Sequence, residues 1–241
     1  MEKLKIVVIG GSGAIGSAIA REVSDNGYIP HLVGRNENDL KKISNDLKCS
    51  YSIADVLNAE NLKKSLENIE GDIFGLAYCV GSIDLKPLSR TNESDFIESY
   101  KLNTIGAITS IKSLLTNLEK NLGSILLFST VAVQQGFANH TIISTSKGAV
   151  EALTLSLAAE LSPKIRVNCI APSLTESKMS QKILSNENVK KIIEAMHPIP
   201  KIGNANDFSK LAAFLLGKNN QWITGQIIHV DGGRSTLRKK G

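Results

Sequence analysis

The stretch Gly10-Gly11-Ser12-Gly13-Ala14-Ile15-Gly16 directly follows the apolar residues 6–9 and opens a segment with helical periodicity at 14–26. Glycines allow positive φ and let the backbone approach a pyrophosphate, whose charge is favoured by free N–H groups at a helix start. Strand, glycine loop and helix in this order are typical of dinucleotide binding. The glycines fit G-x-G-x-x-G from Gly11 and G-x-x-G-x-x-G from Gly10. A tight strand-to-helix turn is the simpler alternative.

Outward from this loop, short β-branched runs alternate with longer amphipathic segments, which is typical of strand–helix–strand units that build a parallel sheet. We predict one α/β domain over residues 1–241, a Rossmann-type doubly wound parallel sheet of about seven strands with helices on both faces. The expected strands are Leu4–Gly10, Ile29–Gly34, Ser50–Ala54, Ile73–Val80, Ser124–Ser129, Ile165–Ile170 and Gln226–Val230. The expected helices are 14–26, 37–47, 58–69, 92–119, 141–162 and 206–216. Residues 174–203 depart from this alternation and are expected to form a substrate lid.

Composition limits the classes of partner. Of 241 residues, 42% are apolar, enough for a sizeable core. Basic residues exceed acidic ones by 28 to 23, and the excess is spread out except for Arg234, Arg238, Lys239 and Lys240. Nucleic-acid binding would need a clustered patch. We therefore expect no nucleic-acid partner.

The cysteines Cys49, Cys79 and Cys169 follow no metal or redox spacing, which fits a reducing compartment and predicts no metal site. The apolar run that follows the N-terminus is too short for a signal peptide or a membrane span. We expect a cytoplasmic protein without a membrane partner.

The end of the second expected strand bears on cofactor choice. No acidic residue stands there to bind an adenosine ribose 2′-OH, whereas Arg35 offers a charged fork to a 2′-phosphate. This favours NADP(H), with NAD(H) still possible and an ordinary surface arginine as the plain alternative. Asp55 is placed to bind the adenine amino group, although a turn-forming role is also open.

Several segments together resemble the short-chain dehydrogenase/reductase family over about residues 4–233. Asn103-Thr104-Ile105-Gly106 matches the family's Asn-x-x-Gly, and Arg166–Ser173 is similar to Arg-Val-Asn-x-Ile-x-Pro-Gly, with Ser173 replacing glycine. Trp222–Gly233 matches the C-terminal signature. Residues 77–81 share only the final glycine of the family's Asn-Asn-Ala-Gly.

The resemblance implies a small-molecule substrate, a homodimer or homotetramer, and a set of site residues. Asn103 would help hold a proton-relay water, and Lys147 would bind the cofactor ribose. The residues expected to bind the cofactor are Gly10, Ser12, Gly13, Ile15, Gly16, Arg35, Asp55, Val56, Gly81, Lys147, Pro172, Ser173, Thr175 and Ser177.

The family's catalytic register can be counted back from Lys147, which Gly148 follows as in the family. The tyrosine that gives its proton to the substrate oxygen stands four residues before this lysine, and here that position is Ile143. The serine that orients the carbonyl falls at Thr130, so a hydroxyl is retained. A lysine lowers the phenol pKa from about 10, a device that isoleucine cannot use.

His140 lies seven residues before Lys147, and two helical turns of about 7.2 residues bring both to one face. The related enoyl-acyl-carrier-protein reductases place their tyrosine at this spacing. We therefore predict that His140 supplies the proton. Alternatively, His140 caps the helix or lines the pocket, or it stabilises an oxyanion with Thr130 while water near Asn103 supplies the proton.

The leading hypothesis is an NADP(H)-dependent oxidoreductase of the short-chain type that acts on a small carbonyl or activated alkene. Its catalytic residues would be Asn103, Thr130, His140 and Lys147. The alternative is an inactive dinucleotide-binding sensor or regulatory subunit, which the loss of the tyrosine favours. Losing a general acid typically costs a factor of about 10²–10⁴ in rate.

Overall fold

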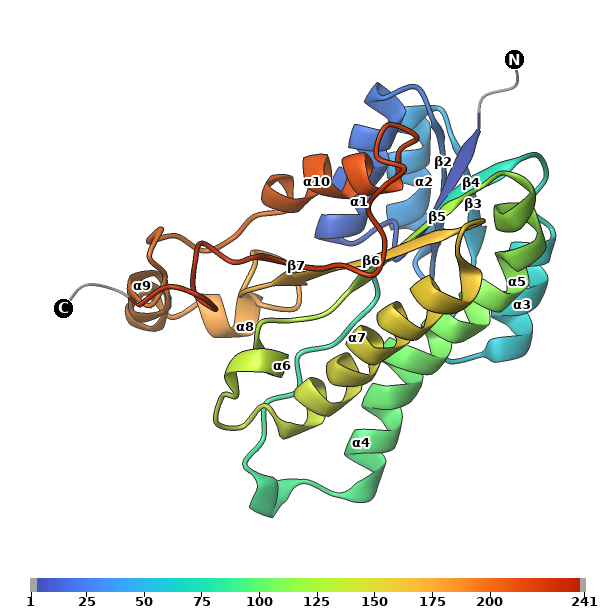
Figure 1. Cartoon of the computed structure of the whole chain (residues 1–241). Helices are drawn as coiled ribbons and strands as arrows, with labels where there is room; N and C mark the ends of the chain where they lie inside the picture. The colour runs from blue at the N-terminus through green and yellow to red at the C-terminus, as the bar shows by residue number, and fades with distance from the viewer. Residues whose placement is uncertain (1–3, 239–241) are drawn as a thin grey trace.

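The computed structural model of the chain describes residues 4–238 (Figure 1). Residues 1–3 and 239–241, which include Lys239 and Lys240, lie outside the described residues. Seven parallel strands form one sheet in the order β3-β2-β1-β4-β5-β6-β7. They are β1 Lys5–Ile9, β2 Ile29–Gly34, β3 Ser50–Ile53, β4 Ile73–Tyr78, β5 Ser124–Phe128, β6 Arg166–Pro172 and β7 Ile227–Val230. The predicted fold class is confirmed.

The central strands are apolar on both faces because helices cover both. Ile6 and Val8 of β1 pack on one face, and Val7 and Ile9 on the other. In Figure 1, α1, α2 and α10 lie above the sheet and α3, α5 and α7 below it, and the two core clusters contain residues from these helices. Their bounds are α1 Ala14–Asp25, α2 Glu37–Leu47, α3 Ala59–Glu67, α5 Gly106–Lys120, α7 Thr141–Leu161 and α10 Asn206–Leu216.

The helix expected at 92–119 is divided into α4 Glu93–Tyr100, a π-helical turn Lys101–Ile105 and α5. At the turn, the Asn103 side chain donates a hydrogen bond to the Ser99 backbone oxygen at 2.9 Å. A side chain that takes up a helical carbonyl competes with the regular backbone ladder. The apolar periodicity predicts one regular helix over 92–119 because it does not register this local competition.

The segment expected as a lid, residues 174–203, contains two helices that the sequence did not predict, α8 Gln181–Leu184 and α9 Glu187–Ala195. They lie beyond the carboxyl ends of β6 and β7 in Figure 1. A further short helix, α6 Ala132–Gln135, ends at Gly136, whose φ is +61°. These pieces surround the end of the sheet where doubly wound folds bind ligands.

Membrane-crossing helices require both length and apolar character, and within residues 4–238 no helix has enough of both.

Candidate active site

A cavity of about 450 Å³ lies at the carboxyl ends of β4, β5 and β6. Its walls come from the glycine loop, the strand ends, the start of α7 and the 174–203 segment. The expected site residues that line it are Gly13, Ile15, Gly16, Gly81, Thr130, His140, Lys147, Pro172, Ser173, Thr175 and Ser177. The remaining expected residues, which are not in its lining, are Gly10, Ser12, Arg35, Asp55, Val56 and Asn103.

The glycine loop fits a phosphate group. Gly10 has a φ of +80°, and its oxygen accepts a hydrogen bond from the Gly13 N–H at 2.9 Å. A Cβ on Gly16 would stand 2.3 Å from that same Gly10 oxygen, so only glycine fits. Helix α1 has no side-chain cap and no acidic residue in its first turn. Its free N–H groups therefore face the cavity edge without a competing anion, as a bound pyrophosphate requires.

Lys147 is buried, and its ammonium donates a hydrogen bond to the Phe128 oxygen at 2.8 Å. Burial lowers the pKa of Lys147 to about 8, and the thiols of Cys169 and Cys79 oppose this shift. A Cβ on Gly81 would stand 3.4 Å from the Lys147 Nζ and 3.2 Å from the Asn103 Oδ1. The three residues therefore meet at one point.

Asn103 lies behind the cavity wall, fully buried on the π-helical turn. Its amide nitrogen is bonded to Ser99, whereas its Oδ1 is buried without a hydrogen-bond partner. A buried oxygen without a partner is costly and is commonly satisfied by water or a ligand. The Asn103 Oδ1 is thus placed to accept a hydrogen bond beside Gly81 and Lys147.

The two neighbouring hydroxyls after β5 have different partners. Ser129 donates a hydrogen bond at 2.6 Å to the buried carboxylate of Glu151, one turn after Lys147 on α7. The Thr130 Oγ accepts a hydrogen bond from the Ala132 N–H at 3.3 Å. Thr130 therefore keeps its hydroxyl hydrogen for a ligand, whereas Ser129 is committed to the helix.

His140 immediately precedes α7 and contacts the cavity. Its Nδ1 lies 2.7 Å from the Ala138 backbone oxygen, which can only accept, so Nδ1 carries a hydrogen. The Phe137 ring packs edge-on against the imidazole, with 5.3 Å between centroids. These contacts leave Nε2 as the nitrogen available to a ligand. In the neutral ring this Nε2 has no proton to give.

Ile143 lies 6% exposed in the same wall, four residues before Lys147. No hydroxyl therefore reaches the cavity from this position. Tyr78 does not replace it, because its hydroxyl donates to the Leu102 oxygen at 2.6 Å and it is not in the lining.

Arg35 and Asp55 come together at the ends of β2 and β3, with 3.8 Å between the guanidinium and the carboxylate. Asp55 also accepts a hydrogen bond from the Leu57 N–H, as a turn-forming aspartate does. The Arg35 side chain is 72% exposed and can turn to another anion. Ser12 lies near Gly34, the residue before Arg35, since a Cβ on Gly34 would stand 3.5 Å from the Ser12 Oγ.

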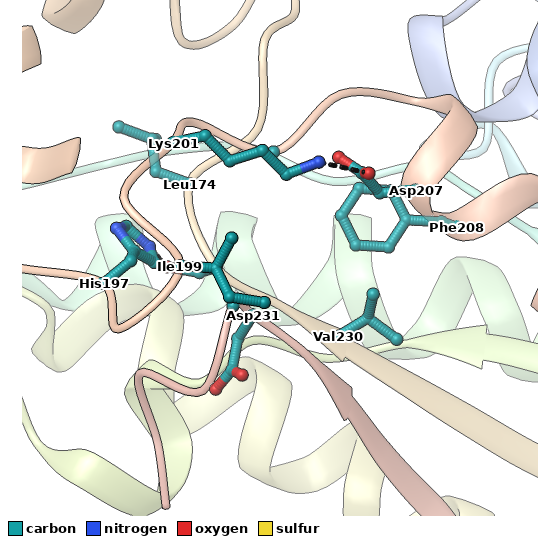
Figure 2. A pocket seen from close by; sticks show the side chains of 11 residues that line it. Leu174, His197, Ile199, Lys201, Asp207, Phe208, Val230 and Asp231 are labelled. Atoms are coloured by element: carbon teal, nitrogen blue, oxygen red, sulfur yellow. Dashed lines mark hydrogen bonds and ion pairs between the residues drawn. The ribbon is translucent and has the colours of Figure 1, made fainter. Parts of the chain in front are cut away.

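Sequence reasoning missed His197, which is buried at the end of the 174–203 segment. Its Nε2 lies 2.8 Å from the Ser173 Oγ, and its Nδ1 lies 2.7 Å from the Ile193 oxygen. This histidine also lines a smaller cavity of about 200 Å³ (Figure 2), together with Leu174 and Ile199. No motif marks His197, because its bond to Ser173 depends on the folding of the whole segment between them.

Arg234 is another residue of the site that its sequence pattern does not mark, because it reads as part of a basic tail. It lines the large cavity, with its guanidinium carbon 4.6 Å from the centroid of the Phe137 ring. The available signal was its position directly after Asp231-Gly232-Gly233, the end of the C-terminal signature.

Comparisons with known proteins place this geometry in a family. A family model described as enoyl-(acyl carrier protein) reductase matches residues 10–235. A tropinone reductase homolog of Arabidopsis thaliana is 31% identical over 97% of this chain and 93% of its own length. A 3-oxoacyl-[acyl-carrier-protein] reductase of Bos taurus is 30% identical over 94% of this chain and 95% of its own.

Among solved structures, ElxO with NADP bound superimposes with a TM-score of 0.90 at 27% identity, covering 98% of this chain and all of that one. The range matched by the family model includes the glycine loop, the Lys147 segment and the C-terminal signature. The chain belongs to the short-chain dehydrogenase/reductase family of oxidoreductases.

Proposed function

We propose that the protein is an NADP(H)-dependent oxidoreductase that reduces a small carbonyl compound or activated alkene, or catalyses the reverse reaction, with His140 as proton donor. One observation carries this proposal. A single cavity of about 450 Å³ brings the glycine loop together with Thr130, His140 and Lys147. A phosphate cradle and three polar groups at one apolar cavity suit a bound dinucleotide facing a substrate.

The choice of NADP(H) is supported by Arg35 at the end of β2 and by the NADP-bound state of ElxO. The Arg35 side chain is exposed, and the Ser12 hydroxyl lies near the preceding residue, Gly34. A 2′-phosphate would compete with Asp55 for Arg35, since a doubly charged group at hydrogen-bond distance is a stronger partner than a carboxylate at 3.8 Å. NAD(H) is the alternative, and the dissociation constants of NADPH and NADH for the wild type and Arg35→Ala distinguish the two.

A bound nicotinamide would supply the hydride for the carbonyl carbon. On the protein side, the Thr130 hydroxyl donates a hydrogen bond to the carbonyl oxygen and orients it. The His140 imidazolium gives its Nε2 proton to that oxygen, which becomes a hydroxyl. The neutral ring then regains a proton from solvent.

His140 must be charged to do this, because Ala138 holds the Nδ1 hydrogen of the neutral ring. Lys147 binds the cofactor in this proposal. Beside Gly81 its ammonium can donate a hydrogen bond and the Asn103 Oδ1 can accept one. A ribose hydroxyl or a water placed there would form hydrogen bonds with both.

The test compares NADPH oxidation by the wild type and His140→Phe over a panel of ketones, aldehydes and enones. Loss of the proton donor should lower kcat about 10²–10⁴-fold with little change in NADPH affinity. Gln134→Ala, an exposed change on α6, is the control. Equal turnover by wild type and His140→Phe would remove His140 from the mechanism.

The second candidate is an inactive dinucleotide-binding sensor or regulatory subunit, which Ile143 in the cavity wall favours. NADPH binding by the wild type without turnover of any panel member would establish it.

The proposal includes one dinucleotide-binding domain over residues 1–241, with 174–203 closing over the cavity as a lid. Two contacts support a closed lid: the bond between Ser173 and His197, and an ion pair of 3.0 Å between Lys178 and Asp39 on α2. We also propose a cytoplasmic homodimer or homotetramer. The exposed apolar side chains Ile97 and Leu155 on α4 and α7 support the assembly.

A further inference from the structure

The charges that line the 450 Å³ cavity are all of one sign. Its lining residues within 4–238 include the cations Lys147 and Arg234 and the proposed imidazolium of His140, and none is an aspartate or glutamate. An apolar cavity with cationic groups and no carboxylate favours an anionic occupant. Lys147 lies beside Gly81 and is proposed to bind the cofactor. The proposed function does not yet explain the second fixed cation, Arg234.

The backbone holds Arg234 in place. Gly232 and Gly233 adopt φ values of +65° and +86°, which turn the chain sharply after β7. The Asp231 carboxylate accepts hydrogen bonds from the Gly233 and Ser235 N–H groups. The Arg234 oxygen accepts one from the Gln135 side chain of α6 at 2.7 Å. The turn is therefore fixed at both sides, and the arginine side chain starts from a defined point.

The Arg234 side chain is partly buried and forms no ion pair with a carboxylate within residues 4–238. Its guanidinium lies over the Phe137 ring, and its Nη2 contacts the Met196 sulfur, a weak acceptor, at 3.5 Å. Burial lowers the pKa of Arg234, although Asp231 opposes this and an arginine stays charged at neutral pH. Its other N–H groups are free for a ligand.

The position of Arg234 relates it to the proposed chemistry. One face of Phe137 holds Arg234, and the same ring packs against His140. A single aromatic ring thus separates Arg234 from the proposed proton donor His140. The surface around them is apolar, with side chains from the strand ends and the lid: Ile83, Leu85, Met179, Ile183, Ile193 and Met196.

We infer that the substrate is a carbonyl compound with a carboxylate or phosphoryl group on a short apolar chain, and that Arg234 binds this anionic group. The inference rests on the proposed function, because the carbonyl is oriented toward Thr130 and His140. Arg234 presents a planar fork that pairs with two oxygens of the anion. A neutral ketone would leave the partly buried Arg234 side chain without that pairing.

The experiment uses the full chain saturated with NADP⁺ or NADPH. The probes are oxo acids of five to eight carbons, their methyl esters and the matching oxoalkylphosphonates. The first readout is binding without turnover: the dissociation constant of each probe for the NADP⁺ complex, by calorimetry. The second is kcat/KM for reduction. The variants are Arg234→Gln and Arg234→Lys, with Arg238→Gln as a control that removes the same charge from an exposed position nearby.

At least one oxo acid or phosphonate should bind the wild type about 10–100-fold more tightly than its ester, the range for a charge-assisted bidentate pair. Arg234→Gln should abolish this preference and leave ester binding unchanged. Arg234→Lys should retain part of it, and Arg238→Gln all of it. Preference for the phosphonate or for the oxo acid identifies the anionic group.

The two hypotheses fail separately. Anion preference in binding that depends on Arg234, without turnover of any probe, supports the anion site and contradicts the proposed oxidoreductase. Turnover with equal affinity for acid, phosphonate and ester overturns the anion site and leaves the oxidoreductase intact. An anion preference that survives in Arg234→Gln also overturns the inference.

Discussion

The Lys147 ammonium donates its hydrogen bond to the Phe128 backbone oxygen, with 2.8 Å between Nζ and O. Phe128 ends β5, so the bond joins the sheet to α7 at the cavity. The acceptor is a neutral carbonyl, and no ion pair involving Lys147 forms within residues 4–238. The free-energy cost of burying the ammonium is therefore not offset by an ion pair, and this burial lowers the pKa of Lys147 to about 8.

Lys147→Met should stabilise the ligand-free protein at pH 7 by about 1–2 kcal/mol, since it removes a buried charge and loses one hydrogen bond. In the wild type, the unfolded lysine binds its proton up to pH 10.5 and the folded one only up to about pH 8. Wild-type stability thus rises with pH across this window, and the advantage of the variant shrinks. Urea unfolding at pH 7.0 and 9.5 measures the difference.

Lys41→Met, a change at an exposed lysine, is the control and should show no such pH dependence. The thiols of Cys79 and Cys169 are present in both proteins, so their ionisation largely cancels. A stability difference that is the same at both pH values would contradict the buried-charge argument.

Ile143→Tyr should raise kcat for carbonyl reduction by about tenfold or more, because it places a phenol one helical turn before Lys147, in the cavity wall. Ile143→Phe matches it in size without the hydroxyl and should not gain activity. NADPH oxidation, followed with an absorbance titration of the new phenol, measures both effects. Equal rates for the two variants would show that a phenol at this position cannot reach the substrate.

Arg35→Ala should raise the dissociation constant of NADPH about tenfold and leave that of NADH unchanged, since only NADPH carries the 2′-phosphate. Quenching of nicotinamide fluorescence on titration measures both constants. Arg21→Ala, which removes another exposed arginine with an acidic partner, serves as the control. If Arg35→Ala weakened the binding of NADPH and NADH equally, Arg35 would attract both dinucleotides through its charge and would not recognise the 2′-phosphate.

Gly16→Ala should destabilise the fold by about 1–3 kcal/mol and weaken dinucleotide binding, because its Cβ would stand 2.3 Å from the Gly10 oxygen. Gly148→Ala is the matched control in α7. Its Cβ would meet nothing closer than 3.7 Å, so the helix should gain up to about 1 kcal/mol. Thermal unfolding with and without NADPH distinguishes the two. Normal NADPH binding by Gly16→Ala would contradict the close-approach argument.

Where signals are local, the sequence predicts the fold well. Strand β2 and helices α2 and α10 have their predicted bounds, because caps, glycines and apolar periodicity are short-range features. The sequence pattern ends β6 at Ile170, two residues before its end in the structure, because Ala171 and Pro172 join the strand by pairing with His229 and Val230 of β7. The π-helical turn at Asn103 is accompanied by a side-chain bond to Ser99 that periodicity does not register.

The candidate site divides in the same way. The positions of the glycine loop, Lys147 and His140 follow from motif and spacing. The contacts of Phe137 with Arg234, and of Ser173 with His197, join segments that are far apart in the chain. Such pairs leave no local sequence pattern, so the sequence alone could not show that Arg234 lines the cavity beside Phe137.

The π-helical turn at Lys101–Ile105 has a consequence for sequence change. An α-helix rotates about 100° per residue, so deleting one residue here would turn α4 and α5 into one regular helix and rotate one against the other. The deletion would restore a backbone hydrogen-bond ladder without a break, yet carry Asn103 away from Gly81 and Lys147. The shortened chain would still contain every residue of the site, but the rotation of one helix against the other would separate Asn103 from Gly81 and Lys147.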